Sequence, residues 1–237
     1  RNNDLPPYLR EGSKSEIYAP KNGNRFNITT SSFINGEEGV NEHGLAVAMT
    51  FVMTSLEKIR AGFNSCFIVR YLLEKADSTD NAISMLMELP IASNCNILIA
   101  DKSGKMFVIE CTPFTKRIRE AENVDGGKIV CTVNNFTSDE MKLHDAANGD
   151  DYHATKRYHT VMDSFHAHIN GNLIEATEQL LKGAYGFICQ YDDEPDFETV
   201  WSSVFDLESL IIYRAEGEPR KKKFLVDSRL HDIVQGK

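Results

Sequence analysis

Three short polar segments of the sequence carry side chains that could take part in catalysis. Arg1 and Asp4 place a cation and an anion three residues apart, shortly before a pair of prolines. Residues 39–47 form a turn-rich stretch that runs into an apolar strand, and Asn134 and Asn135 end another strand with two amides. An amide at a strand end can donate its N–H groups to a developing oxyanion, although an isolated Asn–Asn pair is more typical of a turn or a cap.

The other common catalytic motifs are absent from the sequence. It contains no G-x-G-x-x-G, no phosphate-binding loop, no H-E-x-x-H and no G-x-S-x-G. The usual support for dinucleotide, nucleotide, zinc-protease and α/β-hydrolase chemistry is therefore missing. His166 and His168 lie two residues apart on a predicted helix and would point about 200° apart, and His153 and His159 are also badly spaced for one helix face. We predict no metal site and no cofactor.

The charge balance argues against a nucleic-acid partner. The 237 residues include 26 Lys and Arg against 35 Asp and Glu, a net charge of −9, so the positive field that non-specific nucleic-acid binding needs is missing. The basic run at residues 220–223 is typical of a solvated turn. The longest apolar runs, such as residues 95–100, are far shorter than the ~20 residues that span a bilayer. We predict a globular protein without a membrane span.

The cysteines show no metal-binding or disulfide pattern. Their number is odd and no two are spaced as C-x-x-C, so neither a zinc ribbon nor a disulfide framework is predicted. Several lie in apolar, strand-like runs, where a free cysteine acts as a small buried hydrophobic residue. This usage favours a reducing, cytoplasmic location. The five are Cys66, Cys95, Cys111, Cys131 and Cys189.

The first residues are unusual for a natural N-terminus. Residues 1–7 contain no Met, no apolar signal-peptide core and no disordered polar lead. They are typical of a strand end that runs into a proline-rich turn. We therefore expect a segment upstream of Arg1, which leaves the presence of a signal peptide open.

Hydrophobic periodicity predicts pairs of helices between groups of strands. Alternating apolar residues between turn signals indicate strands, and apolar residues at helical spacing indicate helices. Residues 35–44 are expected to form a turn-rich connection and residues 138–152 a polar surface excursion. Strands are predicted at residues 27–34, 44–51, 94–101, 106–112, 116–120, 128–133, 199–206 and 209–214, and helices at 65–76, 78–89, 154–168 and 173–182.

The order of these elements predicts the architecture. Hairpin-linked strands form antiparallel sheets, and helices in sequential pairs can cover one outer face of each sheet. Stacking the two sheets would bury the near-continuous apolar strands on both faces. We therefore predict an α+β fold, a four-layer α-β-β-α sandwich of two antiparallel sheets, in a single domain over residues 1–237.

Taken together, the polar segments resemble the choloylglycine hydrolase and isopenicillin N acyltransferase family of N-terminal-nucleophile amidases, which act on linear amides. That family shows an Arg-Asn-x-Asp segment, which residues 1–4 match. It also shows G-[MV]-N-E-x-G-L-A-[VI], which residues 39–47 match with His43 in the free position. Its strand-end T-N-[HS]-[FP] segment is similar to residues 133–136, with departures at Val133 and Asn135.

Two further motifs extend the resemblance over nearly the whole chain. Residues 94–110 are similar to the family's N-[IL]-[IL]-x-x-D-x-x-G-x-x-x-[VI]-x-E hairpin. Residues 201–206 and 215–219 resemble the closing hairpin of the acyltransferase branch. Each motif is moderately specific, but the whole set in the family's order is hard to obtain by chance.

The resemblance implies the α-β-β-α fold of N-terminal-nucleophile hydrolases and a cysteine nucleophile. In the family this cysteine is exposed by removal of Met or of a propeptide, and it lies about one β-hairpin before the Arg-Asn-x-Asp segment. Cys66 opens a predicted helix, and the other cysteines lie within the body of the chain. We therefore expect the nucleophilic cysteine, with the first strand or strands of the domain, upstream of Arg1.

The resemblance also implies a role for each matched residue. Arg1 would favour the thiolate form of the cysteine, and Asp4 would orient its α-ammonium group and pair with Arg1. The amide of Asn134 would stabilise the tetrahedral oxyanion. Bile-salt and penicillin V relatives have a second Asn after the G-L-A-V strand, where this chain has Thr50. The backbone N–H or the hydroxyl of Thr50 is therefore the candidate second oxyanion donor.

The function that the resemblance implies is an amidase that hydrolyses a linear C–N amide bond of a small N-acyl compound through an acyl-cysteine intermediate. Two alternatives stay open. An acyltransferase on the same fold would pass the acyl group to an amine instead of water, and a catalytically dead relative would only bind a small molecule. The identity of the substrate and the formation of a homo-oligomer also stay open.

Overall fold

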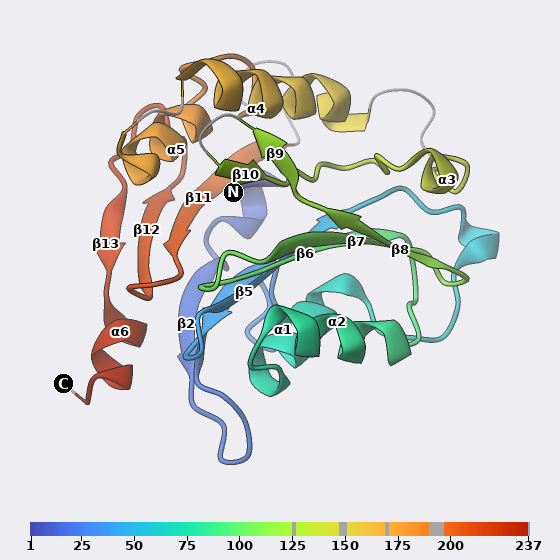
Figure 1. Ribbon diagram of the computed structural model, residues 1–237, viewed down its shortest axis with the longest axis horizontal. Helices are drawn as coiled ribbons and strands as arrows, with labels where there is room; N and C mark the ends of the chain where they lie inside the picture. The colour runs from blue at the N-terminus through green and yellow to red at the C-terminus, as the bar shows by residue number, and fades with distance from the viewer. Residues whose placement is uncertain (125–126, 147–150, 169–170, 190–196, 237) are drawn as a thin grey trace.

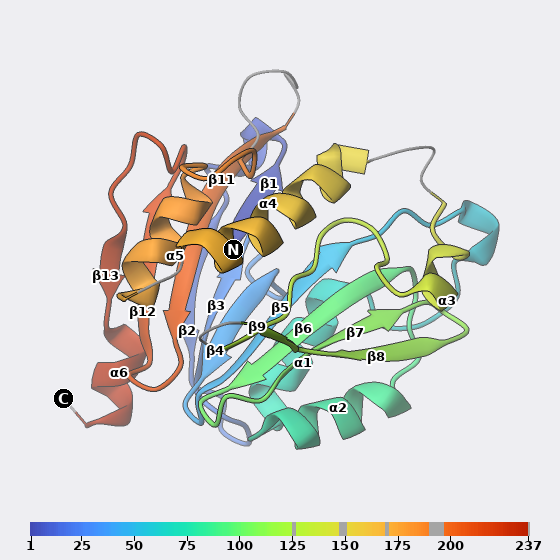
Figure 2. The same ribbon diagram turned by 45° about the horizontal axis from the view of Figure 1, so that its top comes forward.

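Two antiparallel sheets lie face to face, and helices cover the outer side of each sheet (Figures 1 and 2). The predicted hairpins form parts of both sheets, and the predicted helix pairs lie outside them. The computed structural model describes residues 1–124, 127–146, 151–168, 171–189 and 197–236.

The larger sheet is an antiparallel meander of seven strands. They are β2 (Lys14–Tyr18), β3 (Phe26–Thr30), β4 (Glu38–Asn41), β5 (Leu45–Phe51), β6 (Cys95–Asp101), β7 (Met106–Cys111) and β8 (Lys116–Glu120). Each strand pairs with the next one along the chain. Most of the connections are therefore short, and only the link from β5 to β6 is long enough to hold two helices.

The smaller sheet joins the two ends of the chain. In spatial order its strands are β1 (Asn2–Leu5), β11 (Glu198–Asp206), β12 (Ile211–Glu216) and β13 (Leu225–Asp227), and each pair is antiparallel. Asn2 lies opposite Ser202 and Asp4 opposite Thr199, with a shift of register between Asn3 and Asp4. The segment that resembles the family's Arg-Asn-x-Asp motif thus lies beside the closing hairpin.

Two pairs of helices complete the four layers. Helices α1 (Ser65–Lys75) and α2 (Thr79–Glu88) cover the larger sheet, and α4 (Ala154–His168) and α5 (Leu173–Leu181) cover the smaller one (Figures 1 and 2). Helix α1 begins at Ser65 because the Asn64 side chain accepts a hydrogen bond from the backbone N–H of Phe67. This arrangement confirms the predicted α-β-β-α sandwich.

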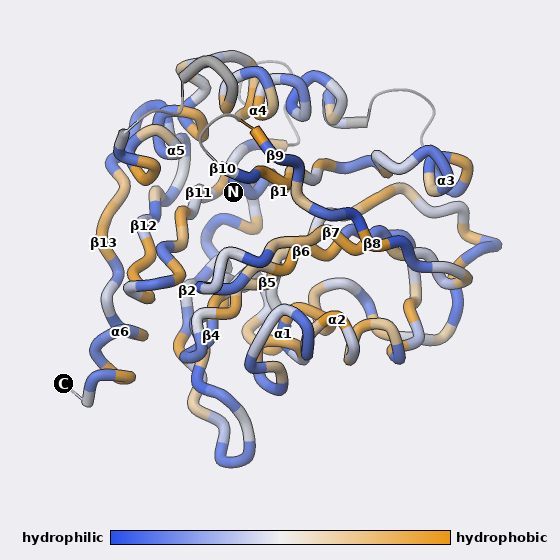
Figure 3. The backbone as a smooth tube through the Cα atoms, viewed as in Figure 1, coloured by the Kyte–Doolittle hydropathy of each residue, from blue (hydrophilic) through white to orange (hydrophobic). Residues whose placement is uncertain are grey.

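The largest hydrophobic core lies between the larger sheet and its two helices. Helix α1 buries Ile68, Val69, Leu72 and Leu73, which share one face because they are three to four residues apart. They pack against buried residues of β3, β5, β6 and β7. Figure 3 shows hydrophobic residues along these strands and on α1 and α2. The core makes the strands β5 to β7 a rigid platform for the residues on their other face.

The structure corrects two of the predicted elements. Residues 35–44, expected to be a turn-rich connection, contain the interior strand β4, whose polar residues Glu38 and Asn41 are fully buried. A polar sequence can form a central strand when each buried side chain finds a partner. The strand predicted at residues 128–133 is only the short β10 (Gly127–Ile129), paired with β9 (Glu122–Val124).

The remaining elements are short. They are the 3₁₀ turns Pro7–Leu9, Leu56–Lys58 and Asp151–His153 and the helices α3 (Asp139–Lys142) and α6 (Arg229–Val234). Among the described residues, none of the helices has the length and apolar character that a bilayer crossing requires. The prediction of free cysteines is confirmed, since all five are unpaired thiols.

Candidate active site

The side chains singled out in the sequence gather where β1, the end of β5 and residues 131–138 meet. Strand β1 belongs to the smaller sheet and β5 to the larger one, so this point lies between the two sheets. The marked N-terminal end of the chain lies next to β11, the strand with which β1 pairs (Figures 1 and 2). Segments from distant parts of the sequence can therefore contribute to one site.

The guanidinium group of Arg1 is held by the larger sheet. It donates to the carbonyl oxygens of Met49 and, at 3.0 Å, of Glu37, and its Nε lies 3.2 Å from Oε2 of Glu38. Glu38 is fully buried, and the indole N–H of Trp201 donates to its Oε1 at 3.1 Å. Because these partners fix the planar guanidinium from several sides, Arg1 presents a positive charge in a defined position.

The carboxylate of Asp4 faces α4 instead of Arg1. The hydroxyl of Thr199 donates to its Oδ1 at 2.5 Å, and Nη1 of Arg157 lies 3.5 Å from its Oδ2. The expected pairing of Asp4 with Arg1 is thus replaced by separate partners. Arg157 on α4 pairs with Asp4, and Glu38 of the larger sheet pairs with Arg1. Burial raises the pKa of Asp4 above its ordinary value of 3.8, and the charge of Arg157 opposes this shift.

Asn134 is joined to Asp4 through Arg157. The Nδ2 of Asn134 donates to the carbonyl oxygen of Phe51 at 3.0 Å, and its Oδ1 accepts from Nη2 of Arg157 at 2.7 Å. The Nη1 of the same guanidinium pairs with Asp4, and its Nε donates to the carbonyl oxygen of Tyr152 at 3.0 Å. One planar side chain on α4 therefore sets the relative position of two residues that are far apart in the sequence.

Arg1 and Asn134 bind to the same stretch of β5. Arg1 donates to the carbonyl oxygen of Met49, and Asn134 donates to that of Phe51, two residues further along the strand. Since a strand advances about 3.4 Å per residue, these two carbonyl groups lie about 7 Å apart. The structure thus places Arg1 and Asn134 at the end of β5, and Arg157 links Asp4 to Asn134.

The hydroxyl of Thr50 is engaged inside the protein. It donates to the carbonyl oxygen of Val133 at 2.8 Å, lies 3.2 Å from Oγ1 of Thr132 and accepts from Nδ2 of Asn96 at 3.1 Å. A hydroxyl group can donate only one hydrogen bond, and here the carbonyl oxygen of Val133 accepts it. We therefore withdraw the hydroxyl of Thr50 as an oxyanion donor and keep only its backbone N–H as a predicted one.

Reasoning from the sequence missed two residues of this group, Glu38 and Arg157. Glu38 lies among turn-forming residues. The only feature of the sequence that pointed to it was the family-like stretch that begins at the next residue. Arg157 lies on a polar helix, where most arginines are solvated, but it is only 8% exposed because Asp4 and Asn134 face it. No local pattern marks either residue, since the burial of each depends on partners from other elements.

Four of the cysteines are protonated thiols at neutral pH. Burial raises the pKa of Cys66 and Cys131 to about 12 and that of Cys189 to about 11. A hydrogen bond with Cys95, together with burial, raises the pKa of Cys111 well above its ordinary value. The thiolate is the form that attacks a carbonyl group, so none of these four has the character of an activated nucleophile.

The described residues contain no group of three or more His, Cys, Asp or Glu side chains that could hold a metal ion. The ring of His153 lies 5.3 Å from that of Phe187, edge to face, and the ring of His159 lies 6.0 Å from that of Tyr158. The side chains of His166 and His168 lie outside the described part of the chain.

The burial of Asp4 predicts a change in the pH dependence of stability when it is replaced. Its folded pKa exceeds the unfolded value of 3.8, so its contribution to the free energy of unfolding is fully present below pH 3.8 and is lost as the pH rises through the folded pKa. Asparagine does not titrate, so Asp4→Asn lacks this pH-dependent loss. Above pH 3.8 the free energy of unfolding of the variant should therefore fall less steeply with pH than that of the wild type. Urea unfolding at a series of pH values up to about 7 measures the two slopes. A steeper fall in the variant would contradict the argument.

A family model covers most of the chain. The model described as acyl-coenzyme A:6-aminopenicillanic acid acyl-transferase matches residues 1–221. No curated protein matches the sequence. The match includes β1, β5, residues 131–138, α4 and the closing hairpin of β11 and β12, so every element of the candidate site falls within it.

Solved structures show the same fold at low sequence identity. An ortholog of N-acylethanolamine-hydrolyzing acid amidase from Caenorhabditis elegans has a TM-score of 0.60 and 14% identity, over 87% of this chain and 86% of that one. A variant of conjugated bile acid hydrolase from Clostridium perfringens has a TM-score of 0.58 and 15% identity, over 96% of this chain and 85% of that one. Penicillin V acylase from Agrobacterium tumefaciens has a TM-score of 0.53 and 17% identity, over 90% of this chain and 73% of that one. These neighbours have the N-terminal-nucleophile hydrolase fold, and so does this chain.

Proposed function

Since this chain belongs to the acyl-coenzyme A:6-aminopenicillanic acid acyl-transferase family, we propose that it is an amidase that cleaves a linear C–N amide bond of a small N-acyl compound. One observation carries the proposal. Arg157 ties Asp4 to Asn134 beside the stretch of β5 that holds Arg1, so a cation, a carboxylate and an amide converge at one point between the sheets.

The nucleophile in this proposal is a cysteine that precedes Arg1 in the full-length protein, with a free α-amino group. Its thiol, with a pKa of about 8.5, and its amine, with a pKa of about 8, differ little in basicity, so the amine can take the thiol proton near neutral pH. The thiolate adds to the amide carbonyl carbon, the C–N bond breaks, and the leaving amine takes the proton. Water then attacks the carbonyl carbon of the thioester and gives up a proton to the α-amine. The C–S bond breaks, which releases the acid and returns the cysteine to its starting form.

The described residues divide the remaining tasks. The fixed charge of Arg1 stabilises the thiolate, and the carboxylate of Asp4 accepts a hydrogen bond from the α-ammonium group and orients it. The Nδ2 of Asn134 carries two N–H groups, of which one is directed to Phe51 and the other donates to the tetrahedral oxyanion. In this assignment Arg157 is a positioning residue, since it holds the carboxylate of Asp4 and the oxygen of the Asn134 amide.

The family match favours a second candidate, an acyltransferase. The matching model is described as an acyl-transferase, and residues 201–206 resemble the closing hairpin of that branch. In this reaction an amine attacks the same thioester, and the product is a new amide instead of an acid. Both reactions share the acyl-cysteine, so the acceptor alone distinguishes them.

Mass spectrometry of the intact full-length protein tests the proposal. The protein is incubated with a panel of N-acyl amides that differ in acyl chain, with and without an added acceptor amine. We expect a mass increase equal to one acyl group, located by fragmentation on the N-terminal cysteine, and release of the free amine. A variant with that cysteine replaced by alanine is the matched control and should form no adduct.

The products separate the candidates. Accumulation of the free acid supports the amidase, and formation of a new amide from the added amine supports the acyltransferase. A protein that forms no adduct and releases no amine from any member of the panel would be a relative that only binds its ligand, and the proposed function would be wrong.

A further inference from the structure

The hairpin of β6 and β7 carries two buried polar residues that the proposed chemistry does not use. Asn96 and Glu110 lie directly opposite each other in the register of the two strands. Both are buried, with exposed fractions of 1% and 0%. They are the first and last polar residues of the hairpin motif noted in the sequence. A buried amide and a buried carboxylate side by side are costly unless each finds a partner, so their partners indicate their purpose.

Asn96 holds the backbone on both sides of Asn134. Its Nδ2 lies 3.0 Å from the carbonyl oxygen of Val133 and 3.0 Å from that of Asn135. The same nitrogen lies 3.1 Å from the hydroxyl oxygen of Thr50, which itself donates to Val133. The carbonyl groups of the residues before and after Asn134 are therefore anchored to the rigid platform of the larger sheet through one amide.

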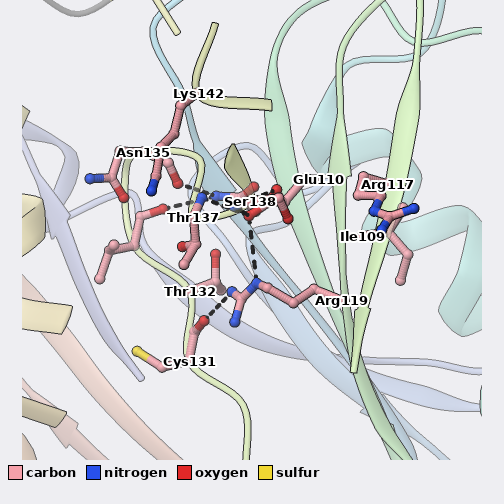
Figure 4. Close-up of polar contacts among 12 residues, drawn as sticks. Ile109, Glu110, Arg117, Arg119, Cys131, Thr132, Asn135, Thr137, Ser138 and Lys142 are labelled. Atoms are coloured by element: carbon pink, nitrogen blue, oxygen red, sulfur yellow. Dashed lines mark hydrogen bonds and ion pairs between the residues drawn. The ribbon is translucent and has the colours of Figure 1, made fainter. Parts of the chain in front are cut away.

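Glu110 and its ion-pair partner Arg119 hold the two ends of the same segment (Figure 4). Its Oε1 accepts from the backbone N–H of Thr137 at 2.7 Å, and both of its oxygens lie 3.2 Å from the backbone nitrogen of Ser138. Arg119 pairs with it at 3.5 Å and donates to the carbonyl oxygen of Cys131 at the other end of the segment. The carboxylate and its arginine thus span residues 131–138, as the dashed lines in Figure 4 show.

The segment depends on these side chains because its backbone forms no strand-to-strand hydrogen bonds with a neighbouring strand. Residues 131–136 follow the short strand β10 and belong to no strand. Backbone groups that sheet pairing would normally satisfy are met instead by Asn96, Glu110 and Arg119. An oxyanion donor must stay within about 0.5 Å of its productive position, which a segment held only by its chain ends would not ensure.

We infer that Asn96 and Glu110 are positioning residues that hold the amide of Asn134 in place for the oxyanion. The inference rests on the proposed function for its catalytic consequence, whereas the mechanical part, the anchoring of residues 131–138, holds for any use of the site. Neither residue touches the substrate in this assignment, and both act through the backbone around Asn134.

Two measurements on Asn96→Ala in the full-length protein test the inference. In hydrogen–deuterium exchange, peptides from residues 131–138 should exchange about tenfold faster than in the wild type, because a main-chain anchor is lost. In steady-state kinetics kcat should fall about 10- to 100-fold, with KM changed less than about threefold, because a displaced oxyanion donor acts on the transition state.

Asn41→Ala is the matched control. Asn41 is as buried as Asn96, and its Nδ2 also donates to two main-chain carbonyl oxygens, those of Leu73 at 3.0 Å and Ala76 at 2.7 Å. These lie at the end of α1, away from residues 131–138. The control should lower the melting temperature without changing kcat or the exchange of the segment. Should Asn96→Ala fail to fold, Glu110→Gln, which keeps one acceptor oxygen and loses the charge, replaces it with the same readouts.

A double-mutant cycle separates positioning from a general loss of stability. In an Asn134→Ala background, Asn96→Ala should change kcat less than about twofold, because no oxyanion donor remains to be positioned. Full additivity would overturn the inference. An unchanged exchange rate of residues 131–138 in Asn96→Ala would also overturn it, even in a protein that cleaves no amide. If only the proposed function is wrong, turnover will be absent but the exchange difference will remain.

Discussion

Replacing Asn134 by alanine should lower kcat by about 10²–10³-fold and leave KM nearly unchanged. An oxyanion donor acts mainly in the transition state, where negative charge develops on the carbonyl oxygen, and contributes little to the binding of the neutral substrate. The amide group of Asn134 is fixed in orientation. Its Nδ2 donates to the carbonyl oxygen of Phe51, and its Oδ1 accepts from Arg157.

The neighbouring residue provides the control for this variant. The Nδ2 of Asn135 lies 3.5 Å from the hydroxyl oxygen of Thr155, and its side chain belongs to the same segment. Asn135→Ala should therefore keep kcat within about threefold of the wild type. Steady-state kinetics with the best amide of the panel measures both variants. If Asn134→Ala is fully active and Asn135→Ala is not, the strand-end motif has been matched to the wrong asparagine.

Replacing Arg157 by alanine should lower both the stability and the activity of the protein. The side chains of Arg157 and Asp4 are only 10% and 11% exposed, so the variant leaves a buried carboxylate without its cation. Such a loss typically lowers the free energy of unfolding by about 3–5 kcal/mol. Because Asn134 and Asp4 also lose their common anchor, we expect kcat to fall about 10²-fold or more.

Two further variants separate charge from geometry at this position. Arg157→Lys keeps the positive charge but loses the planar fork that reaches Asp4 and Asn134 together, so stability should recover more than kcat does. Lys156→Ala, which removes an exposed cation from the adjacent position, should change both quantities little. Urea unfolding and steady-state kinetics give the two readouts. A variant Arg157→Lys with wild-type kcat would show that charge alone suffices.

The helices, the hairpins and the family could be predicted because they depend on local patterns. Helix α1 follows from the spacing of Ile68, Val69 and Leu72, and the hairpin of β6 and β7 follows from a turn signal between alternating apolar strands. The five cysteines were correctly expected to be free, since spacing alone excludes the common disulfide and metal patterns. These features need only residues that are close in the sequence.

Partners could not be predicted, because packing chooses them from distant elements. Strand β4 was expected to be a turn, since nothing in its own residues reveals that Trp201 and Arg1 would meet the carboxylate of Glu38. The hydroxyl of Thr50 was expected to be available to the site, but the carbonyl oxygen of Val133 lies against it and accepts its hydrogen bond.

The sequence by itself determined which residue types are available for catalysis and in which elements they lie. Only the tertiary structure decided that Asp4 meets Arg157 instead of Arg1, because the docking of α4 brings the guanidinium group of Arg157 to Asp4, while the larger sheet holds Arg1 through Glu38. In the same way, the short strand β10 leaves residues 131–136 unpaired, and the burial of Asn96 and Glu110 beneath them decides where the amide of Asn134 lies.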